Sequence, residues 1–176
     1  MKQLKLAALM VFLCTGVNGY TQTEETPKFD YHLEYVMGPY LFVDNIVYDA
    51  VFMNGCRLGF KLNPHFDFSI EYVVGQGEDV FNNFGMTHNA NLQFAYYPWV
   101  TNSRFKPYFF TGGGFFEFKE FTTDVYGISV HAGSGTLLEF TPRVNGIIEA
   151  RYLNTGLLDV NAENQLAVFW GARINF

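Results

Sequence analysis

Apolar residues alternate with small or polar residues through the final segment of the chain, from Gln165 to Phe176. Successive side chains of a β-strand point to opposite faces, so residues two apart share a face. One face would carry Leu166, Val168, Trp170, Ala172, Ile174 and Phe176, and the other Gln165, Gly171, Arg173 and Asn175. The pattern predicts an amphipathic strand that ends on an aromatic residue.

The same alternation recurs upstream, most cleanly after Phe66, where Phe68 and Ile70 oppose Ser69 and Glu71. Splitting the chain at its turn signals gives eight segments near the roughly 9 to 11 residues that a tilted membrane strand needs. They are Tyr31–Phe42, Phe52–Leu62, Phe66–Gly75, Thr87–Tyr97, Lys106–Phe116, Gly127–Thr141, Asn145–Leu153 and Gln165–Phe176.

The distribution of charge between the two faces indicates which face is outside. A soluble sandwich or lipocalin-like barrel would also alternate, but with its polar face outward. Here the polar face carries nearly all mid-strand charges and many glycines, which suits the interior of a small barrel. The sequence therefore predicts an all-β fold, an eight-stranded antiparallel transmembrane β-barrel with meander (up-and-down) topology.

Composition agrees with a barrel in lipid. Aromatic residues make up 19% of the chain and charged residues only 16%, against about 25% in an ordinary soluble domain. The net charge of −6 argues against a nucleic-acid partner, which requires a basic surface.

The amino-terminal residues have the pattern of an export signal. A basic start at Met1–Lys5 precedes an apolar run, Leu6–Leu13, and small residues before Tyr20. We expect residues 1–19 to be a signal peptide, residues 20–30 a periplasmic tail and residues 31–176 the barrel domain. Acylation of Cys14 is disfavoured because the bulky Leu13 precedes it. Once Cys14 leaves, Cys56 has no partner for an internal disulfide.

Connection lengths predict the orientation of the barrel. Asn63–His65 and Thr141–Arg143 are tight turns, and Pro98–Phe105 is a longer connection at the same end. Longer, more polar connections are expected at Leu41–Val51, Gln76–Met86, Glu117–Tyr126 and Asn154–Asn164. Short turns are periplasmic and long loops extracellular in such barrels. Both termini should therefore be periplasmic, in a protein integral to a bacterial outer membrane.

Charged residues on the lumen face are the candidate functional residues. They are Arg57, Lys61, Asp67, Glu71, Glu139, Glu149, Arg151 and Arg173, with Glu34 and His131 as further candidates. An eight-stranded barrel is just wide enough for side chains to fill it, so these charges should pair across the lumen. Two interpretations are open: a structural ion-pair network, or a gated ion path in which an acid such as Glu71 exchanges partners.

Several stretches resemble the small OmpA/OmpX-like outer-membrane barrel superfamily, over residues 31–176. They are Leu58–Phe66, Arg104–Gly114, Glu139–Pro142 with Ile148–Tyr152, and the terminal Phe176. The resemblance implies that the final strand, with Trp170, Ile174 and Phe176, is an assembly signal for the barrel-assembly machinery. It also implies periplasmic chaperones, outer-membrane lipid and lipopolysaccharide as partners. We expect no peptidoglycan-binding domain after the barrel, so the resemblance does not imply cell-wall tethering.

The resemblance also raises an enzymatic alternative, because small outer-membrane barrels include lipid A deacylases and acyltransferases. Ser129, His131, Ser134 and Glu139 approach a triad, but Glu139 is too far along the strand to contact His131. The four histidines are dispersed, so no metal or cofactor is expected. We predict a non-enzymatic structural or adhesion-type surface protein whose loops contact a host or surface ligand. The alternatives are a narrow, low-conductance ion pore and, more remotely, a lipid A-modifying enzyme.

Overall fold

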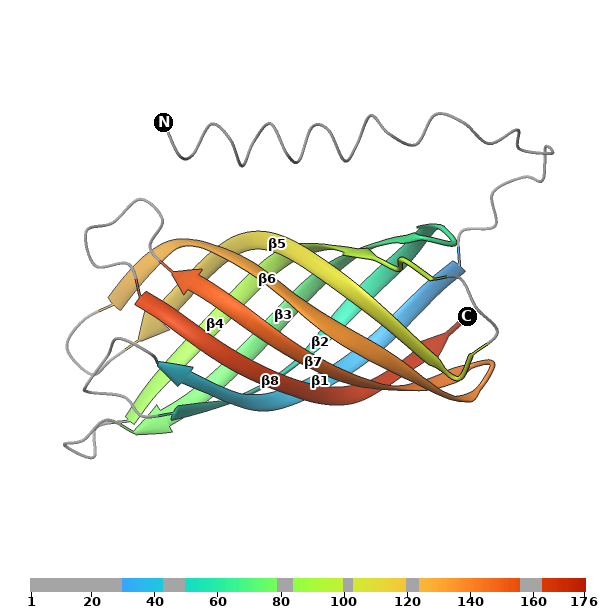
Figure 1. Ribbon diagram of the computed structural model, residues 1–176. Coiled ribbons are helices and arrows are strands. Elements are labelled where there is room, and N and C mark those ends of the chain that lie inside the picture. The colour runs from blue at the N-terminus through green and yellow to red at the C-terminus, as the bar shows by residue number, and fades with distance from the viewer. Residues whose placement is uncertain (1–29, 43–49, 79–83, 100–102, 120–123, 156–162) are drawn as a thin grey trace, which may run out of the picture.

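The protein forms a closed barrel of eight antiparallel strands in a computed structural model (Figure 1). The structure describes residues 30–42, 50–78, 84–99, 103–119, 124–155 and 163–176. The predicted signal peptide and nearly all of the predicted tail therefore lie outside the described residues. The strands are β1 (Asp30–Phe42), β2 (Ala50–Asn63), β3 (Phe66–Glu78), β4 (Phe84–Tyr96), β5 (Phe105–Lys119), β6 (Asp124–Thr141), β7 (Val144–Thr155) and β8 (Glu163–Asn175).

Each strand pairs with its neighbours in sequence, and β1 pairs with β8 to close the barrel. The eight-stranded meander predicted from the alternation is confirmed. The seam continues to the last residue, because the Phe176 N–H donates to the Tyr31 carbonyl at 2.9 Å. The start of β1 and the carboxy terminus consequently lie at the same end of the barrel (Figure 1).

Several strands extend beyond their predicted ends. Glu78 on β3 still pairs with Phe84 on β4, and Lys119 on β5 still pairs with Asp124 on β6. The predicted loops at Gln76–Met86 and Glu117–Tyr126 are thus partly strand. The reason is that ladder hydrogen bonds join backbone groups, so pairing can continue through polar sequence that periodicity assigns to a loop. The centres of all four predicted long loops lie outside the described residues.

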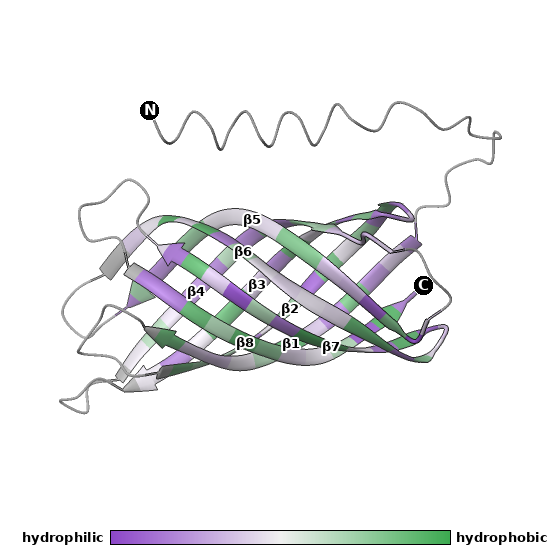
Figure 2. Cartoon of the chain, viewed as in Figure 1, coloured by the Kyte–Doolittle hydropathy of each residue, from purple (hydrophilic) through white to green (hydrophobic). Residues whose placement is uncertain are grey.

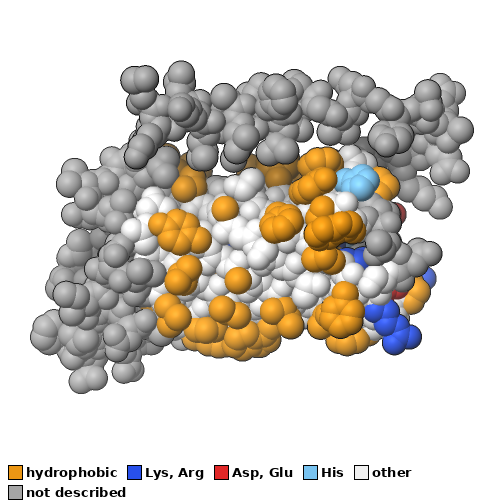
Figure 3. Space-filling view, viewed as in Figure 1, with side chains coloured by type: hydrophobic (Ala, Val, Ile, Leu, Met, Phe, Trp, Pro, Cys, Tyr) orange, Lys and Arg blue, Asp and Glu red, His pale blue; other side chains and the backbone are white. Residues whose placement is uncertain are grey.

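Hydrophilic and hydrophobic residues alternate along the strands (Figure 2), and their side chains lie on opposite sides of the barrel wall. On β3, Ile70 and Tyr72 are exposed, whereas Asp67, Ser69 and Glu71 are buried. Figure 3 shows apolar side chains spread over the outer surface. A soluble barrel would have the reverse arrangement, and an apolar exterior around a polar interior is the organisation of a transmembrane barrel. Among the described residues, no helix is long and apolar enough to cross a membrane.

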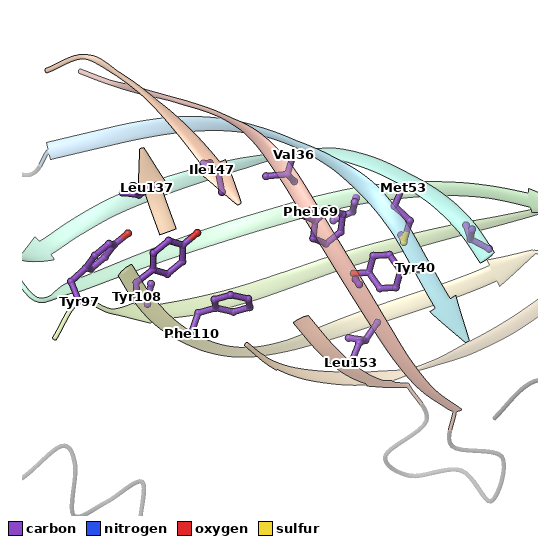
Figure 4. Packing of buried hydrophobic residues seen from close by; sticks show 14 residues of the cluster. Val36, Tyr40, Met53, Tyr97, Tyr108, Phe110, Leu137, Ile147, Leu153 and Phe169 are labelled. Carbon is purple, nitrogen blue, oxygen red and sulfur yellow. The ribbon is translucent and has the colours of Figure 1, made fainter. Parts of the chain in front are cut away.

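Apolar residues also occupy part of the interior (Figure 4). Tyr40 packs edge-on against Phe169 with ring centroids 5.3 Å apart, and Tyr97 lies 5.2 Å from Tyr108. Tyr40 is on β1 and Phe169 on β8, whereas Tyr108 is on β5 and Tyr97 directly follows β4. They fill the space around the inward charges, so the interior of the described barrel is packed with side chains.

Candidate functional site: the charged interior of the barrel

Three arginines meet four carboxylates inside the barrel. Strand pairing places some of them directly opposite one another: Glu34 lies between Arg57 on one side and Arg173 on the other, and Arg57 is opposite Glu71. All point inward because they share the buried parity of their strands. We call the charge plug the set Glu34, Arg57, Asp67, Glu71, Glu149, Arg151 and Arg173, whose members are all at most 7% exposed.

Arg57 is the centre of the plug. Its guanidinium donates to Glu34 at 2.5 Å, to both oxygens of Glu149 at 2.8 and 3.0 Å, and to Glu71 at 2.7 and 3.1 Å. These carboxylates come from β1, β7 and β3. From β2, this one side chain therefore connects the two neighbouring strands, β1 and β3, with β7 on the other side of the lumen.

Arg151 forms the second layer. Its two terminal nitrogens donate to the two oxygens of Glu71 at 2.6 and 2.8 Å, a bidentate pairing that fixes orientation as well as distance. The same guanidinium donates to Gln93 at 3.1 Å and lies 4.9 Å from the ring centroid of Phe169 and 5.3 Å from that of Phe110. The aromatic faces add cation–π attraction to a group already removed from water.

Arg173 forms the layer closest to the chain termini. It donates to Glu34 at 2.7 Å, to Asp67 at 3.0 Å and to the Tyr97 hydroxyl at 3.1 Å. The Tyr97 hydroxyl in turn donates to Asp67 at 3.0 Å. Every plug carboxylate therefore accepts hydrogen bonds from an arginine, which offsets much of the cost of burying ions.

The structure brings together most of the residues that parity assigned to the lumen. Arg57, Asp67, Glu71, Glu149, Arg151 and Arg173 all lie in the plug, and so does Glu34. His131 is buried nearby, but neither of its ring nitrogens has a hydrogen-bond partner among the residues that the structure describes. The sequence analysis missed the uncharged partners Asn91, Gln93, Tyr97 and Tyr108, although Asn91, Gln93 and Tyr108 have the inward parity of their strands. Asn91 donates to Glu71 at 3.1 Å, and Tyr108 donates to Glu149 at 2.6 Å.

Lys61 and Glu139 were expected in the network and do not join it. Both have the inward parity, but they lie near the strand ends, where the barrel opens to water. Lys61 is exposed. Glu139 pairs with Lys106 at 2.5 Å, and these two side chains are 30% and 36% exposed. Parity reports which way a side chain points but not its depth, so it cannot separate the mouth from the interior.

The candidate triad residues are not assembled as a catalytic group. Ser134 is exposed on the outer wall, opposite in parity to the buried Ser129 and His131, and Glu139 is at the mouth. The Ser129 hydroxyl donates to Asn91 at 3.1 Å. In the described part of the chain, no group of three or more His, Cys, Asp or Glu side chains could hold a metal ion.

The proposed assembly-signal residues lie on the outside of β8 and at the residue that follows it. Trp170 is 42% exposed, Ile174 45% and Phe176 73%. Cys56 is also exposed on the outer wall. These positions leave the aromatic strand accessible from the membrane side, and recognition by an assembly factor stays a prediction.

No protein-family model matches the sequence, and neither does any curated protein. Solved structures do match. Neisserial surface protein A has a TM-score of 0.67 at 15% identity, covering 84% of this chain and 97% of that one. The outer membrane protein OprG from Pseudomonas aeruginosa has a TM-score of 0.56 at 12% identity, covering 88% and 99%. Ail, the attachment invasion locus protein of Yersinia pestis, has a TM-score of 0.51 at 13% identity, covering 84% and 97%.

These matches are small eight-stranded outer-membrane barrels, and each is covered over nearly its whole length. They confirm, at the level of the fold, the resemblance that the sequence motifs indicated. At identities of 12 to 15% the likeness shows the fold alone.

Proposed function

We propose that this protein is an integral outer-membrane barrel whose interior is closed to ions and whose role is structural or adhesive at the cell surface. The observation that carries the proposal is the charge plug. Its seven side chains are buried and paired across an interior that is just wide enough for side chains. We infer that a lumen filled in this way leaves no continuous water path at the level of Arg57.

The proposed orientation places both termini in the periplasm. It is supported by the two tight connections at the end that holds the termini, where Pro64 and His65 alone join β2 to β3, and Pro142 and Arg143 alone join β6 to β7. Residues 1–19 would be the signal peptide that directs export. In this orientation, residues 43–49, 79–83, 120–123 and 156–162 connect strands on the extracellular side.

A surface role is supported by the kinds of protein that share the fold. One is a neisserial surface protein, and Ail has been crystallised in complex with the heparin analogue sucrose octasulfate. We propose that this chain likewise contacts a host or surface ligand through its extracellular connections. We also propose that the barrel-assembly machinery recognises Trp170, Ile174 and Phe176, after periplasmic chaperones deliver the unfolded chain.

A second candidate function is a gated ion path. The observation that favours it is the sharing of Glu71 between two guanidinium groups, since Arg57 and Arg151 both donate to this carboxylate. A carboxylate with two partners could release one and keep the other. Such a rearrangement would open the plug without leaving Glu71 unpaired.

Planar-bilayer recording separates the two candidates. Purified, folded protein should give no reproducible current steps if the plug is closed. Glu139→Gln is the matched control for Glu71→Gln, because Glu139 lies at the mouth and pairs outside the plug. Steps in the wild type that change with Glu71→Gln but not with Glu139→Gln would contradict a closed interior and support the ion path.

A further inference from the structure

The three arginines of the charge plug do not balance its four carboxylates. Arg151 pairs with both oxygens of Glu71, and Arg57 donates to both oxygens of Glu149. These two pairs together have no net charge. The remaining arginine, Arg173, contacts two carboxylates. The plug therefore has a surplus of one negative charge in the layer closest to the chain termini.

The surplus lies on Glu34 and Asp67, the two carboxylates that accept hydrogen bonds from Arg173. Arg57 also donates to Glu34, but its charge is already counted against Glu149. Asp67 is 4% exposed, and its Oδ1 atom has no hydrogen-bond partner among the described residues. A buried carboxylate with incomplete compensation is costly, because it has lost the water that would solvate its charge. A fourth cation in this layer would reduce that cost.

His32 is placed to supply this cation. The side chain is 3% exposed, and its Nε2 atom lies 3.2 Å from Glu34 Oε1. The two atoms are not aligned as a hydrogen bond, and Nε2 has no other such partner in the described part of the chain. A neutral imidazole here would be a buried polar group whose nitrogen makes no hydrogen bond. An imidazolium is attracted to the carboxylate without alignment, because the attraction between two charges depends on their distance.

Gly59 determines where this imidazole lies. It is directly opposite His32 on β2, and a Cβ atom at Gly59 would be 1.9 Å from His32 Nε2. The ring therefore occupies space that the side chain of any larger residue at this position would fill. On the other side of β1, the residue opposite His32 is the uncharged Asn175 of β8.

The charged and titratable groups that surround His32 fall into two sets. Those at the level of the plug are Glu34 on β1, Arg57 on β2, Asp67 on β3, Tyr97 after β4 and Arg173 on β8. Those at the mouth are Asp30, Lys61, Lys106, Glu139 and the carboxylate of Phe176. Both arginines already donate to carboxylates, which offsets their repulsion of a further cation. The groups at the mouth have both signs and are screened by water.

We propose that His32 carries a proton and is the fourth cation of the charge plug, so that the layer closest to the termini is a proton-binding site. Four cations then balance four carboxylates. Loss of the proton would leave Arg173 alone against Glu34 and Asp67, so this layer would be the first to loosen as the solution becomes alkaline. The inference requires the folded plug but neither a closed lumen nor a surface ligand, and its failure would leave the proposed function standing.

NMR of the full, folded chain in nanodiscs tests the proposal, because the chemical shifts of the imidazole nitrogens distinguish an imidazolium from a neutral ring. His32→Gln identifies the signals of His32. At pH 7.5 an unperturbed imidazole is charged in only about one molecule in ten, and we expect His32 to be charged in more than about half. His131 is the internal control. It is also buried, but it forms neither a hydrogen bond nor an ion pair with a carboxylate of the described residues, so it should be neutral.

Glu34→Gln should return His32 to the neutral form at pH 7.5, because it removes the carboxylate 3.2 Å away. Glu139→Gln is the matched control, since Glu139 pairs with Lys106 at the same end but outside the plug, and it should leave the charged fraction of His32 unchanged. Gly59→Ala displaces the ring without altering any charge, so it should also lower the charged fraction, and it keeps the test available if Glu34→Gln does not fold. A neutral His32 in the wild type, or equal effects of Glu34→Gln and Glu139→Gln, would overturn the proposal.

Discussion

Replacing Arg57 with methionine removes the charge that joins three carboxylates while keeping most of the side-chain volume. Glu34 would retain Arg173, and Glu71 would retain Arg151. Glu149 would lose both of its short arginine contacts and keep only Arg151 at 3.4 Å and the Tyr108 hydroxyl at 2.6 Å. Glu149 should therefore carry most of the penalty.

The expected cost follows from leaving a buried charge with inadequate compensation, which typically destabilises a protein by about 3–5 kcal/mol. Glu149→Gln on the Arg57→Met background removes that charge and keeps an oxygen for Tyr108. The wild-type plug has four carboxylates and three arginines, so its formal charge is −1. The double variant has three carboxylates and two arginines, and its formal charge is again −1. The double variant should recover at least about 1.5 kcal/mol relative to Arg57→Met.

Equilibrium unfolding by urea in phospholipid vesicles, followed by fluorescence of Trp99 and Trp170, measures these differences. Lys61→Met is the control, since Lys61 is an exposed cation outside the plug and should cost less than about 0.5 kcal/mol. A cost below about 1 kcal/mol for Arg57→Met would refute the reasoning. So would simple additivity in the double variant, because it would mean that Arg57 and Glu149 are not coupled.

Ile70→Arg should destabilise the folded barrel by about 2–4 kcal/mol in the same assay, whereas Leu62→Arg at the end of β2 should cost about 0–1 kcal/mol, because the penalty for a lipid-facing cation falls toward the interface. Equal costs at the two positions would argue against a place for Ile70 near the bilayer midplane and for Leu62 near the interface. Gly114→Ala should cost about 1–3 kcal/mol, since a Cβ there would lie 1.9 Å from the Ala90 carbonyl oxygen. Gly113→Ala, whose Cβ would be 3.0 Å from its nearest neighbour, should cost clearly less. Phe176→Asp should lower the yield of heat-modifiable barrel in the outer membrane more than Asn175→Asp does, and equal yields would contradict the assembly-signal proposal.

The sequence was sufficient to predict the strands and their faces because both depend on a local period of two. Ile70 and Glu71 take opposite faces whatever their neighbours do. The charges of the two faces then indicated which face was inside. Strand ends were less predictable, because pairing at Glu78 and Lys119 depends on backbone hydrogen bonds that leave no periodic signal.

The contacts of the plug could not be predicted from parity. Which inward residues meet depends on strand register and on the tilt of the strands around the barrel, and both are properties of the closed sheet. Arg173 meets Asp67 and Tyr97 across the lumen, although neither is on a neighbouring strand. The same limitation placed Lys61 and Glu139 in the network, since depth within the barrel has no counterpart in the alternation.

The central claim is that the apolar face of the barrel contacts lipid and the charged face is enclosed, and methyl contacts to lipid test it most directly. In nanodiscs, nuclear Overhauser effects can be measured between side-chain methyl groups and the acyl-chain protons of the lipid. The outward methyls of Ile70, Leu92 and Val168 should show strong effects, and the inward methyls of Val73, Ile147 and Leu153, all at most 1% exposed, should show none. Comparable effects in both sets, or effects confined to the inward set, would contradict the account.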